Sequence, residues 1–576
     1  MKDIIKKQID LALFKLIEAD NVTLQIPLDF QIERPKNEDF GDYSSNVALK
    51  LAKFLSRAPK DIAERVRPEL MSSGAFSSVT VAGAGFLNFR LKDKYVFEAI
   101  DPVFELADKY GENNQGAGRS VQIEFVSANP TGPLHIGHGR GAAIGSAVAK
   151  LLELSGFDVC REYYVNDAGR QIDILAVSVL VHILRFKGRE VELPEKAYQG
   201  DYIRDIAQKI SDAGADQWSV ELAFDAKEKD AEKVLDTLIS VAKNALGSDL
   251  YSELRDTVIK EVLKEIKSDL EYFGVEFDSW FSENSLESNH SIDDALITLE
   301  KNGFLYRNDG AIWFRSSDLG DEKDRVVERE NGTRTYFASD IAYHLDKYKR
   351  GFDELINVWG ADHHGYIPRV RASIDALGES SATLTIILVQ FAALVRKGER
   401  ISMSTRSGEY ITLRSLLDEV GRDAARFFFV GRKADQHLDF DVDLATAKST
   451  ENPVYYIQYA HARVCSVYRQ LDEKGWEFPS SVTYAGVLTM EIERKLALTI
   501  SRYPTVVEDA AVAREPHMLA TYLRELATEF HTYYNNSKFL VSQDSVRCAR
   551  LRLIGATKQV LANGLSALGV SAPEKM

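Results

Sequence analysis

The sequence predicts a multidomain α/β protein: a parallel-sheet fold with insertions, preceded by an N-terminal α/β domain and followed by a C-terminal all-α bundle. Three observations support this prediction. A chain of 576 residues is too long for a single hydrophobic core. Between residues 119 and 445, apolar runs of strand length alternate with helical patterns, which is typical of crossover connections. From Asp423 onward, apolar residues recur three and four positions apart, which indicates packed helices.

Composition is that of an ordinary folded protein. The chain is 45% hydrophobic and 27% charged, and no apolar run is long enough to cross a bilayer. Its first 21 residues form an amphipathic pattern with acidic side chains, unlike a targeting segment, so we expect a cytoplasmic protein without a membrane partner. Cys160, Cys465 and Cys548 are isolated, so neither a disulfide framework nor a protein-bound structural metal is expected.

Charge is unevenly distributed along the chain. The net charge is −16, yet residues 451–576 hold 14 Lys and Arg against 13 Asp and Glu. The acidic excess therefore lies in residues 1–450. Local basic patches can still bind RNA, so composition neither shows nor excludes an RNA partner.

Residues 1–110 are expected to form a separate α/β domain. The pattern predicts a helix over 47–55 and a strand over 79–91 that contains Gly83 and Gly85. The polar, glycine-rich segment 111–118 suits a domain boundary.

The most informative pattern lies in residues 121–156. The apolar run 121–126 suits a buried strand, and a turn with two prolines follows it. Helical spacing then continues to Leu152, with Gly156 as a stop, and 158–165 is predicted as the next strand. This unit is the first half of a Rossmann-type nucleotide fold, predicted over 119–189. The turn after its second strand contains three polar residues: Asn166, Asp167 and Gln171. They can line the same edge of the sheet, although residues of this kind are more often only turn residues.

His135 and His138 stand at the start of the predicted helix, with Gly137 between them. Backbone amides, imidazoles and the positive end of the helix dipole can all approach a phosphate there. A glycine-rich helix start with two solvated histidines is the alternative. We favour phosphate binding, because the strand before and the helix after supply the context that such a motif requires.

Residues 190–334 are expected to be an insertion that is mainly helical at first. Alternating charges over 224–243 and 256–267 favour a solvated helix face over a binding site. Short β-type runs are predicted over 302–306, 310–314 and 334–337.

The second half of the nucleotide fold is predicted over 335–445. A turn is expected to carry Tyr336 and Asp340 into a helix over 341–348, and a strand over 355–359 precedes Asp362-His363-His364. Two adjacent histidines beside an aspartate also suggest a metal site, but no third ligand follows them at the spacing that is typical of metal sites. A loop rich in cations spans 396–408.

From Asp423 onward, helices are predicted over 424–430, 454–468, 491–507, 518–534 and 546–568. The C-terminal domain, 446–576, is predicted to be an all-α bundle. Tyr455, Tyr459 and Arg463 crowd its first long helix. Aromatic and arginine side chains stack on unpaired RNA bases, although packing between domains explains the same residues.

The segment Pro133-Leu-His135-Ile-Gly137-His138 resembles the first signature of class I aminoacyl-tRNA synthetases. Around it, Glu124-Phe-Val-Ser-Ala-Asn129-Pro-Thr-Gly-Pro is similar specifically to bacterial arginyl-tRNA synthetases. The resemblance extends over nearly the full length and is strongest at 122–140, 335–344 and 358–369. It implies activation of L-arginine by ATP with Mg²⁺, then transfer to the 3′-terminal adenosine of tRNA(Arg), with release of AMP and pyrophosphate. It also implies an N-terminal domain at the tRNA elbow and a C-terminal anticodon-binding domain, in what we expect to be a monomer.

The resemblance implies a set of site residues. We expect three catalytic residues: His135, His138 and Arg406. We expect ATP to contact the two histidines and five further residues: Gly137, Asp362, His363, Met403 and Ser404. A planar guanidinium needs carboxylates, carbonyls and an aromatic face, which are offered by Glu124, Asn129, Tyr336 and Asp340. A carboxylate inside an apolar strand is costly unless paired, which favours a cationic ligand for Glu124. Expected tRNA contacts are Phe86, Asn88, Tyr455, Tyr459 and Arg463; core packing of Phe86 and turn capping by Asn88 are the alternatives.

One departure from the family pattern concerns the Lys-Met-Ser-Lys loop. The corresponding Ser402-Met403-Ser404-Thr405 lacks both lysines, and Gly132 occupies the position where some members carry a compensating lysine. We expect Arg406, with Lys397 or Arg400, to neutralise the leaving pyrophosphate. Two alternatives stay open: a catalytically inactive, synthetase-like tRNA-binding protein, and a class I synthetase for another amino acid. The cysteinyl and methionyl enzymes would show zinc ligands that this chain lacks.

Overall fold

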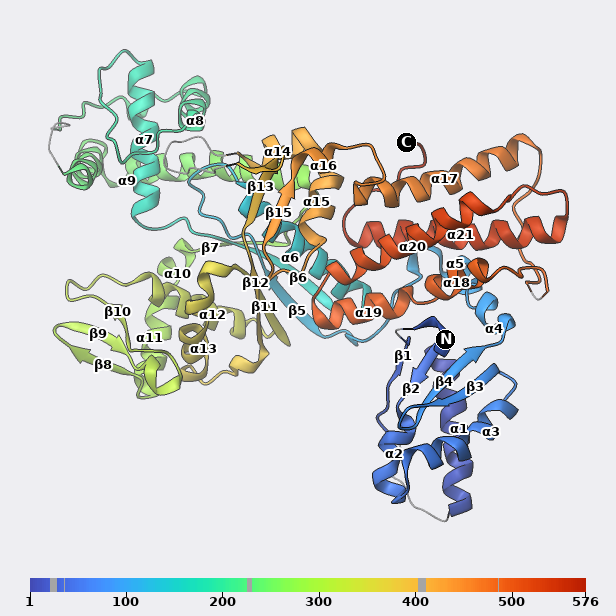
Figure 1. The fold of residues 1–576 in the computed structure, drawn as a ribbon. Coiled ribbons are helices and arrows are strands. Elements are labelled where there is room, and N and C mark those ends of the chain that lie inside the picture. Colours follow the sequence, from blue (N-terminus) through green and yellow to red (C-terminus); the bar gives the residue numbers. More distant parts are fainter. Residues whose placement is uncertain (21–27, 36, 225–229, 402–410, 485) are drawn as a thin grey trace.

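A computed structural model describes residues 1–576 except 21–27, 36, 225–229, 402–410 and 485. At its centre lies a five-stranded sheet of order β12-β11-β5-β6-β7, in which every neighbouring pair is parallel (Figure 1). The strands are β5 (Ser120–Glu124), β6 (Asp158–Val165), β7 (Ser279–Ser282), β11 (Glu354–Gly360) and β12 (Leu384–Val389). The predicted multidomain α/β fold is confirmed, and the carboxyl ends of these strands form one edge where a ligand can bind.

The first crossover is as predicted. α6 (Ile136–Leu154) connects β5 to β6, and Gly156 follows it with φ +80°, a left-handed conformation that favours glycine. The helix packs closely on the sheet, because a Cβ at Gly145 would lie 2.4 Å from the ring of Phe125. Likewise, a Cβ at Gly139 would meet Leu413 and Phe429, so this glycine serves packing between helices.

The second half of the fold begins with a helix rather than a turn. Tyr336 and Asp340 both lie inside α12 (Tyr336–Lys349), so the predicted turn is wrong. Of the β run predicted over 334–337, only Arg334 forms a β-bridge, with Glu328. The aromatic residues that suggested a strand instead belong to α12, whose buried face contains Phe337, Ala338 and Ile341.

A small antiparallel sheet forms part of the insertion. β8 (Leu305–Asn308) and β9 (Ala311–Phe314) are the predicted hairpin, and its third strand is β10 (Arg325–Glu328). Helices beside this sheet are α10 (Asn284–Ser288), α11 (Ser291–Lys301) and α13 (Ile367–Ala376).

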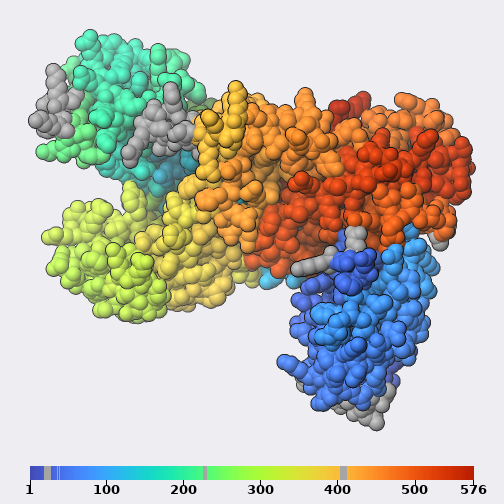
Figure 2. Space-filling view, in the orientation of Figure 1, coloured from blue at the N-terminus to red at the C-terminus, as the bar shows by residue number. Residues whose placement is uncertain are grey.

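The helical part of the insertion forms a second lobe together with α7 (Arg170–Phe186), which precedes the insertion. Its own helices are α8 (Asp201–Asp212) and α9 (Ala231–Phe273), the second of which is kinked at Gly247, where φ is +75°. Figure 2 shows a notch between this lobe and the lobe of β8–β10 and α10–α13.

Residues 1–110 fold around a four-stranded antiparallel sheet of order β1-β2-β4-β3. Its strands are β1 (Ile32–Glu33), β2 (Tyr43–Ser45), β3 (Phe76–Ala82) and β4 (Phe86–Leu91), and its helices are α1 (Lys2–Asp20), α2 (Val47–Leu55), α3 (Pro59–Ser72), α4 (Asp93–Glu98) and α5 (Asp101–Leu106). The single strand predicted over 79–91 is therefore wrong. Gly83 (φ +52°) and Gly85 (φ +127°) instead make a turn that divides it into a hairpin.

The C-terminal domain is the predicted all-α bundle. Its helices are α17 (Pro453–Glu473), α18 (Glu491–Ile500), α19 (Tyr503–Ala513), α20 (His517–Asn536) and α21 (Asp544–Ala567). The single helix predicted over 491–507 is wrong, because Pro504 cannot continue a helix and instead lies in the first turn of α19.

A third small sheet connects the nucleotide fold to the bundle. It contains β13 (Ala392–Arg396), β14 (Glu399–Arg400) and β15 (Leu438–Asp441), with α14 (Leu413–Val420), α15 (Arg422–Val430) and α16 (Val442–Thr446) beside it. Across the residues that the structure describes, no helix combines the length and apolarity that crossing a membrane requires.

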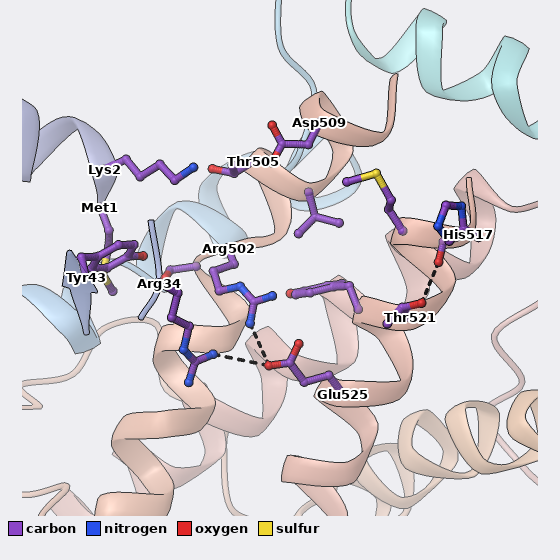
Figure 3. Close-up of a pocket in the computed structure, with 14 residues that line it drawn as sticks. Met1, Lys2, Arg34, Tyr43, Arg502, Thr505, Asp509, His517, Thr521 and Glu525 are labelled. Atoms are coloured by element: carbon purple, nitrogen blue, oxygen red, sulfur yellow. Dashed lines mark hydrogen bonds and ion pairs between the residues drawn. The ribbon is translucent and has the colours of Figure 1, made fainter. Parts of the chain in front are cut away.

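Ion pairs join the N-terminal domain to the bundle. Arg494 of α18 donates to both oxygens of Asp42, at 2.7 and 2.6 Å, and to Asp93 at 3.0 Å. Beside this contact lies a cavity of about 410 Å³ (Figure 3), where Arg34 and Arg502 both donate to Glu525, at 3.4 and 2.8 Å.

Candidate active site

The two histidines of the glycine-rich turn fold back on the start of α6. His135 is the N-cap residue, and its Nδ1 accepts from the backbone N–H of Gly137 at 3.1 Å. The Nδ1 of His138 accepts from the backbone N–H of His135 at 3.3 Å, and the two rings stack with centroids 3.7 Å apart. A Cβ at Gly137 would lie 2.8 Å from the His135 ring, so this arrangement requires glycine.

This geometry determines what the imidazoles can do. Burial lowers the pKa of His135, and burial together with the neighbouring ring lowers the pKa of His138 to about 3. Both rings are therefore neutral near pH 7. Since each Nδ1 accepts a hydrogen bond, the proton of each ring is on Nε2. The pair offers two hydrogen-bond donors and no formal charge.

Arg140, one turn further along α6, does not supply the positive charge that the two neutral histidines lack. Its guanidinium is fully buried and donates to the backbone carbonyls of Gln390, Lys433 and Gln436 at 2.7–3.0 Å. It holds the connection to the bundle together and leaves the phosphate side of the turn to other cations.

The segment that follows the cation-rich loop contacts the histidine turn. Thr412 forms a β-bridge with His135, and the backbone N–H of Leu413 donates to the carbonyl of Leu134 at 2.7 Å. Ser402, Met403, Ser404 and Arg406 lie outside the described residues. Their expected roles stay predictions, but the chain returns to the histidines six residues after Arg406.

Asp362 and His363 lie at the carboxyl end of β11. Both side chains are more than half exposed, and Nε2 of His363 lies 3.6 Å from Oδ2 of Asp362. This position is on the same edge of the sheet as the histidine turn, as expected for parallel strands. Within the described residues, no group of three or more His, Cys, Asp or Glu side chains could hold a metal ion.

The residues predicted to bind arginine gather around the carboxyl ends of β5 and β6. Glu124 ends β5, Asn129 lies in the following turn, and Asp340 projects from α12 close enough for the two charges to interact. Asp340 accepts a hydrogen bond from Tyr366, and the amide of Asn129 donates to Gln171 at 2.9 Å. The exposed ring of Tyr336 stands at the first turn of α12, with its hydroxyl beside Gly169.

The charge of Glu124 already has a partner within the chain. Lys347 of α12, which is fully buried, donates to its Oε2 at 2.5 Å and to Asn357 at 2.8 Å. The second carboxylate oxygen accepts from Ser127 at 2.9 Å. The buried position of Glu124 therefore does not require the cationic ligand that the sequence had predicted, because the ammonium group of Lys347 already pairs with it.

Glu283, which the sequence did not single out, belongs to the same cluster. It follows β7, is 5% exposed, and its Oε2 is buried without a hydrogen-bond partner. Burial first, and then the charge of Asp340, raises the pKa of Glu283 to about 7, and burial raises that of Asp340 to about 6. With Glu124 and Asp167, these carboxylates surround Tyr164, so they outnumber the cations Lys347 and Arg369, which act on Asp340.

The predicted tRNA contacts lie on two other surfaces. Phe86 is 43% exposed and lines a hollow of about 360 Å³ on the N-terminal domain together with Phe40, Asn46 and Asn88. Its alternative assignment to the core is wrong. Asn88 is buried in β4 and does not cap a turn.

On α17, the partly exposed Tyr455 and Tyr459 stack with ring centroids 6.0 Å apart. The guanidinium of Arg463 lies 4.4 Å from the ring of Tyr459 and 4.6 Å from that of Tyr534. The result is a short stack of aromatic and cationic groups on the bundle surface.

Comparison with known proteins identifies three regions of the chain. Residues 2–91 match the arginyl tRNA synthetase N-terminal domain, 103–450 the catalytic domain of class I (R) tRNA synthetases, and 457–576 the DALR anticodon-binding domain. An arginine–tRNA ligase from Thioalkalivibrio sulfidiphilus is 50% identical over all of both chains, and one from Nitrosospira multiformis is 52% identical over 95% of each.

Among solved structures, the arginyl-tRNA synthetase of Thermus thermophilus superimposes with a TM-score of 0.75 over the whole of both chains, at 23% identity. This likeness shows the fold. The matching family models and the full-length identity of about 50% show more: the chain belongs to the arginyl-tRNA synthetase family of class I aminoacyl-tRNA synthetases.

Proposed function

We propose that the chain joins L-arginine to tRNA(Arg) in two steps. The arginine carboxylate attacks the α-phosphorus of ATP, which forms arginyl-adenylate and releases pyrophosphate. A ribose hydroxyl of the 3′-terminal adenosine then attacks the carbonyl carbon, which releases AMP. The observation that carries the proposal is the pocket of Asp340, Glu283 and Glu124 beside the histidine turn, because its negative charge matches a guanidinium.

In this proposal, Asp340 and Glu283 bind the guanidinium. The unpartnered Oε2 of Glu283 accepts one of its N–H groups, and the exposed ring of Tyr336 covers its face. Glu124, held by Lys347, and Asn129 lie one strand nearer the histidines. They suit the backbone end of the amino acid, whose carboxylate must reach the α-phosphate.

His135 and His138 donate from Nε2 to the phosphate oxygens as charge builds on them, and the start of α6 adds its dipole. Acceleration of this kind comes from positioning and charge stabilisation. Gly137, Asp362 and His363 complete the nucleotide side. Mg²⁺ enters with ATP, bound mainly by its phosphates and water.

We further propose that tRNA contacts both outer domains. Phe86 and Asn88 line a hollow suited to an unstacked base at the elbow, and Tyr455, Tyr459 and Arg463 offer stacking surfaces for anticodon bases. A single copy of the chain carries all of these surfaces, which suits action as a monomer.

The deciding experiment is ATP–pyrophosphate exchange and aminoacylation with each of the twenty amino acids, with tRNA present. We expect exchange and charging with arginine alone. Binding of tRNA without either reaction would instead indicate an inactive, synthetase-like tRNA-binding protein, and charging by another amino acid would remove the assignment to arginine.

Asp340→Asn tests the arginine pocket. Removing one charge from a buried, hydrogen-bonded pair costs about 2–5 kcal/mol, so the arginine KM should rise at least about 30-fold. The ATP KM should change little. Asp318→Asn, an exposed carboxylate on the insertion, is the matched control. An unchanged arginine KM in the Asp340 variant would remove this residue from the pocket.

Arg406→Ala tests which cation replaces the missing lysines. The proposal is supported by the tether between Thr412 and His135, which brings this part of the chain back to the phosphate side. The rate of adenylate formation should fall by about 10²–10³ if the guanidinium stabilises developing charge, with little change in the arginine KM. Pre-steady-state exchange measures the rate of adenylate formation and the arginine KM. The variant Arg400→Ala tests the neighbouring cation in the same way.

A further inference from the structure

A second hollow, of about 710 Å³, adjoins the carboxylate pocket. One wall is a face of α9, and the other contains Asp167 and Asn284. The backbone N–H of Asn284 donates to Asp167 at 2.9 Å, and Asp167 is one of the carboxylates that surround Tyr164. The hollow therefore lies at the carboxyl ends of β6 and β7, directly beside the pocket proposed for arginine.

The α9 wall of this hollow is cationic. The helix buries Leu254, Val258, Val262, Ile266 and Leu270 against the rest of the protein. On the opposite face, exposed lysines at positions 260, 264 and 267 line the hollow. Side chains three and four positions apart share a helix face, so the three ammonium groups follow about 10 Å of the axis.

These lysines lack acidic partners. Within the described part of the chain, Lys260, Lys264 and Lys267 form no ion pair, and Lys267 packs over the ring of Trp280 at 4.4 Å. The acidic residues of the α9 wall, Asp256 and Glu271, lie one turn before and one turn after the three. A chain with 87 acidic and 71 basic side chains thus places unpaired cations together at the edge of its acidic pocket.

We propose that this hollow holds the sugar–phosphate backbone of the unpaired 3′ end of the tRNA, a proposal that rests on the function proposed above. The terminal adenosine has to reach the carboxyl edge of the sheet, and the notch between the two lobes in Figure 2 leaves that approach open. Lysines contact phosphates as point charges and read no base. Such a contact suits an RNA end that must be positioned rather than recognised by sequence.

The charge pattern of 256–267 predicts a solvated helix face. In the proposed complex, this face binds the sugar–phosphate backbone of the tRNA. Alternation of acidic and basic residues along the chain hides the fact that the basic residues share one face of the helix. Only the packing of the apolar residues on the other side shows which charges line the hollow.

The test compares two RNAs and three proteins. The RNAs are intact tRNA(Arg) and the same transcript without its unpaired 3′ nucleotides. The proteins are the unmodified chain, the triple variant K260Q/K264Q/K267Q, and the control triple K109Q/K301Q/K349Q, which removes the same charge from exposed lysines elsewhere. Dissociation constants are measured against salt concentration, and thermal midpoints verify folding.

We expect the unmodified chain and the control to bind intact tRNA more tightly than truncated tRNA. The K260Q/K264Q/K267Q variant should bind both RNAs alike, and the slope of its salt dependence for intact tRNA should be shallower by about 2, at about 0.7 per phosphate of a single strand. The triple arginine variant, which keeps the charges, should restore the difference between the RNAs.

A K260Q/K264Q/K267Q variant that still distinguishes the two RNAs as the unmodified chain does would overturn the proposal. So would a loss of affinity that is equal for both RNAs, because the lysines would then act on another part of the tRNA. Aminoacylation by the unmodified chain is measured alongside. If the chain charges no tRNA, the proposed function fails on its own, while the binding comparison still decides what the hollow holds.

Discussion

Two carboxylates in the pocket proposed for arginine have raised pKa values. Burial and the charge of Glu124 raise the pKa of Asp340 to about 6, and burial and the charge of Asp340 raise the pKa of Glu283 to about 7. In the free protein, their ionised forms are disfavoured, so the folded state loses stability as pH rises from the ordinary pKa of a carboxyl group up to these raised values. A bound guanidinium reverses this preference, because it is attracted to the ionised forms.

Arginine binding should therefore strengthen with pH. We expect the arginine KM to fall as pH rises from about 5.5 to 8, because Asp340 and Glu283 become ionised over this range. A pKa difference of one unit corresponds to about 1.4 kcal/mol. Glu283→Gln should raise the KM and remove the part of this dependence near pH 7, leaving the part near pH 6. Steady-state arginylation at saturating ATP and tRNA measures the profile. Glu379→Gln, an exposed control, should keep it, and an unaltered profile in the Glu283 variant would contradict the assignment.

At the scale of elements, the position of the histidine turn depends on how closely α6 approaches β5. A Cβ at Gly145 would lie 2.4 Å from the buried ring of Phe125, whereas a Cβ at Gly141, one turn earlier, would meet nothing within 4 Å. Close packing against Phe125 thus requires glycine at position 145, whereas packing does not require it at position 141.

Gly145→Ala should lower the free energy of unfolding by about 1–3 kcal/mol, the usual cost of overpacking. It should also lower kcat, because the helix carries His135 and His138. Gly141→Ala should be neutral or stabilise by up to about 1 kcal/mol, as alanine is the better helix former. Thermal midpoints and arginylation rates of the pair test this, and equal effects would show that the approach of α6 to the strand is not limiting.

At the scale of the whole molecule, the buried guanidinium of Arg494 on the bundle helps to hold the N-terminal domain in place. The carboxylate of Asp42 and the carbonyl of Leu91 both accept from Arg494, which is almost fully buried. Removing one partner of a buried ion pair leaves the other charge unpaired, at a cost of about 3–5 kcal/mol.

Arg494→Ala should therefore loosen this domain. Limited proteolysis should release residues 1–91 faster, and the tRNA KM should rise while the arginine KM stays nearly constant. Arg524→Ala, an exposed arginine on the same bundle, serves as the control. If the tRNA KM does not change in the Arg494 variant, the orientation of the N-terminal domain has no part in tRNA binding.

Local patterns in the sequence were sufficient for the parts of the fold that short-range forces determine. The strand over 158–165, the helix over 47–55, the first crossover and the histidine turn follow from apolar periodicity and glycine position. The local pattern failed where tertiary burial outweighs it. Residues 334–337 have the composition of a strand, yet only Arg334 forms a β-bridge, and Tyr336 and Phe337 begin α12, which buries Phe337 and Ile341.

Only the tertiary structure decided which charges meet. Lys347 and Glu124 are 223 positions apart in the sequence and touch inside the fold, so no local pattern could show that Glu124 already has its cation. Glu283 had no motif to mark it, and its place in the pocket comes from the pairing of β7 with β6. Periodicity reports how one segment folds, whereas the pKa of a carboxylate depends on burial and on charges that distant segments bring to it.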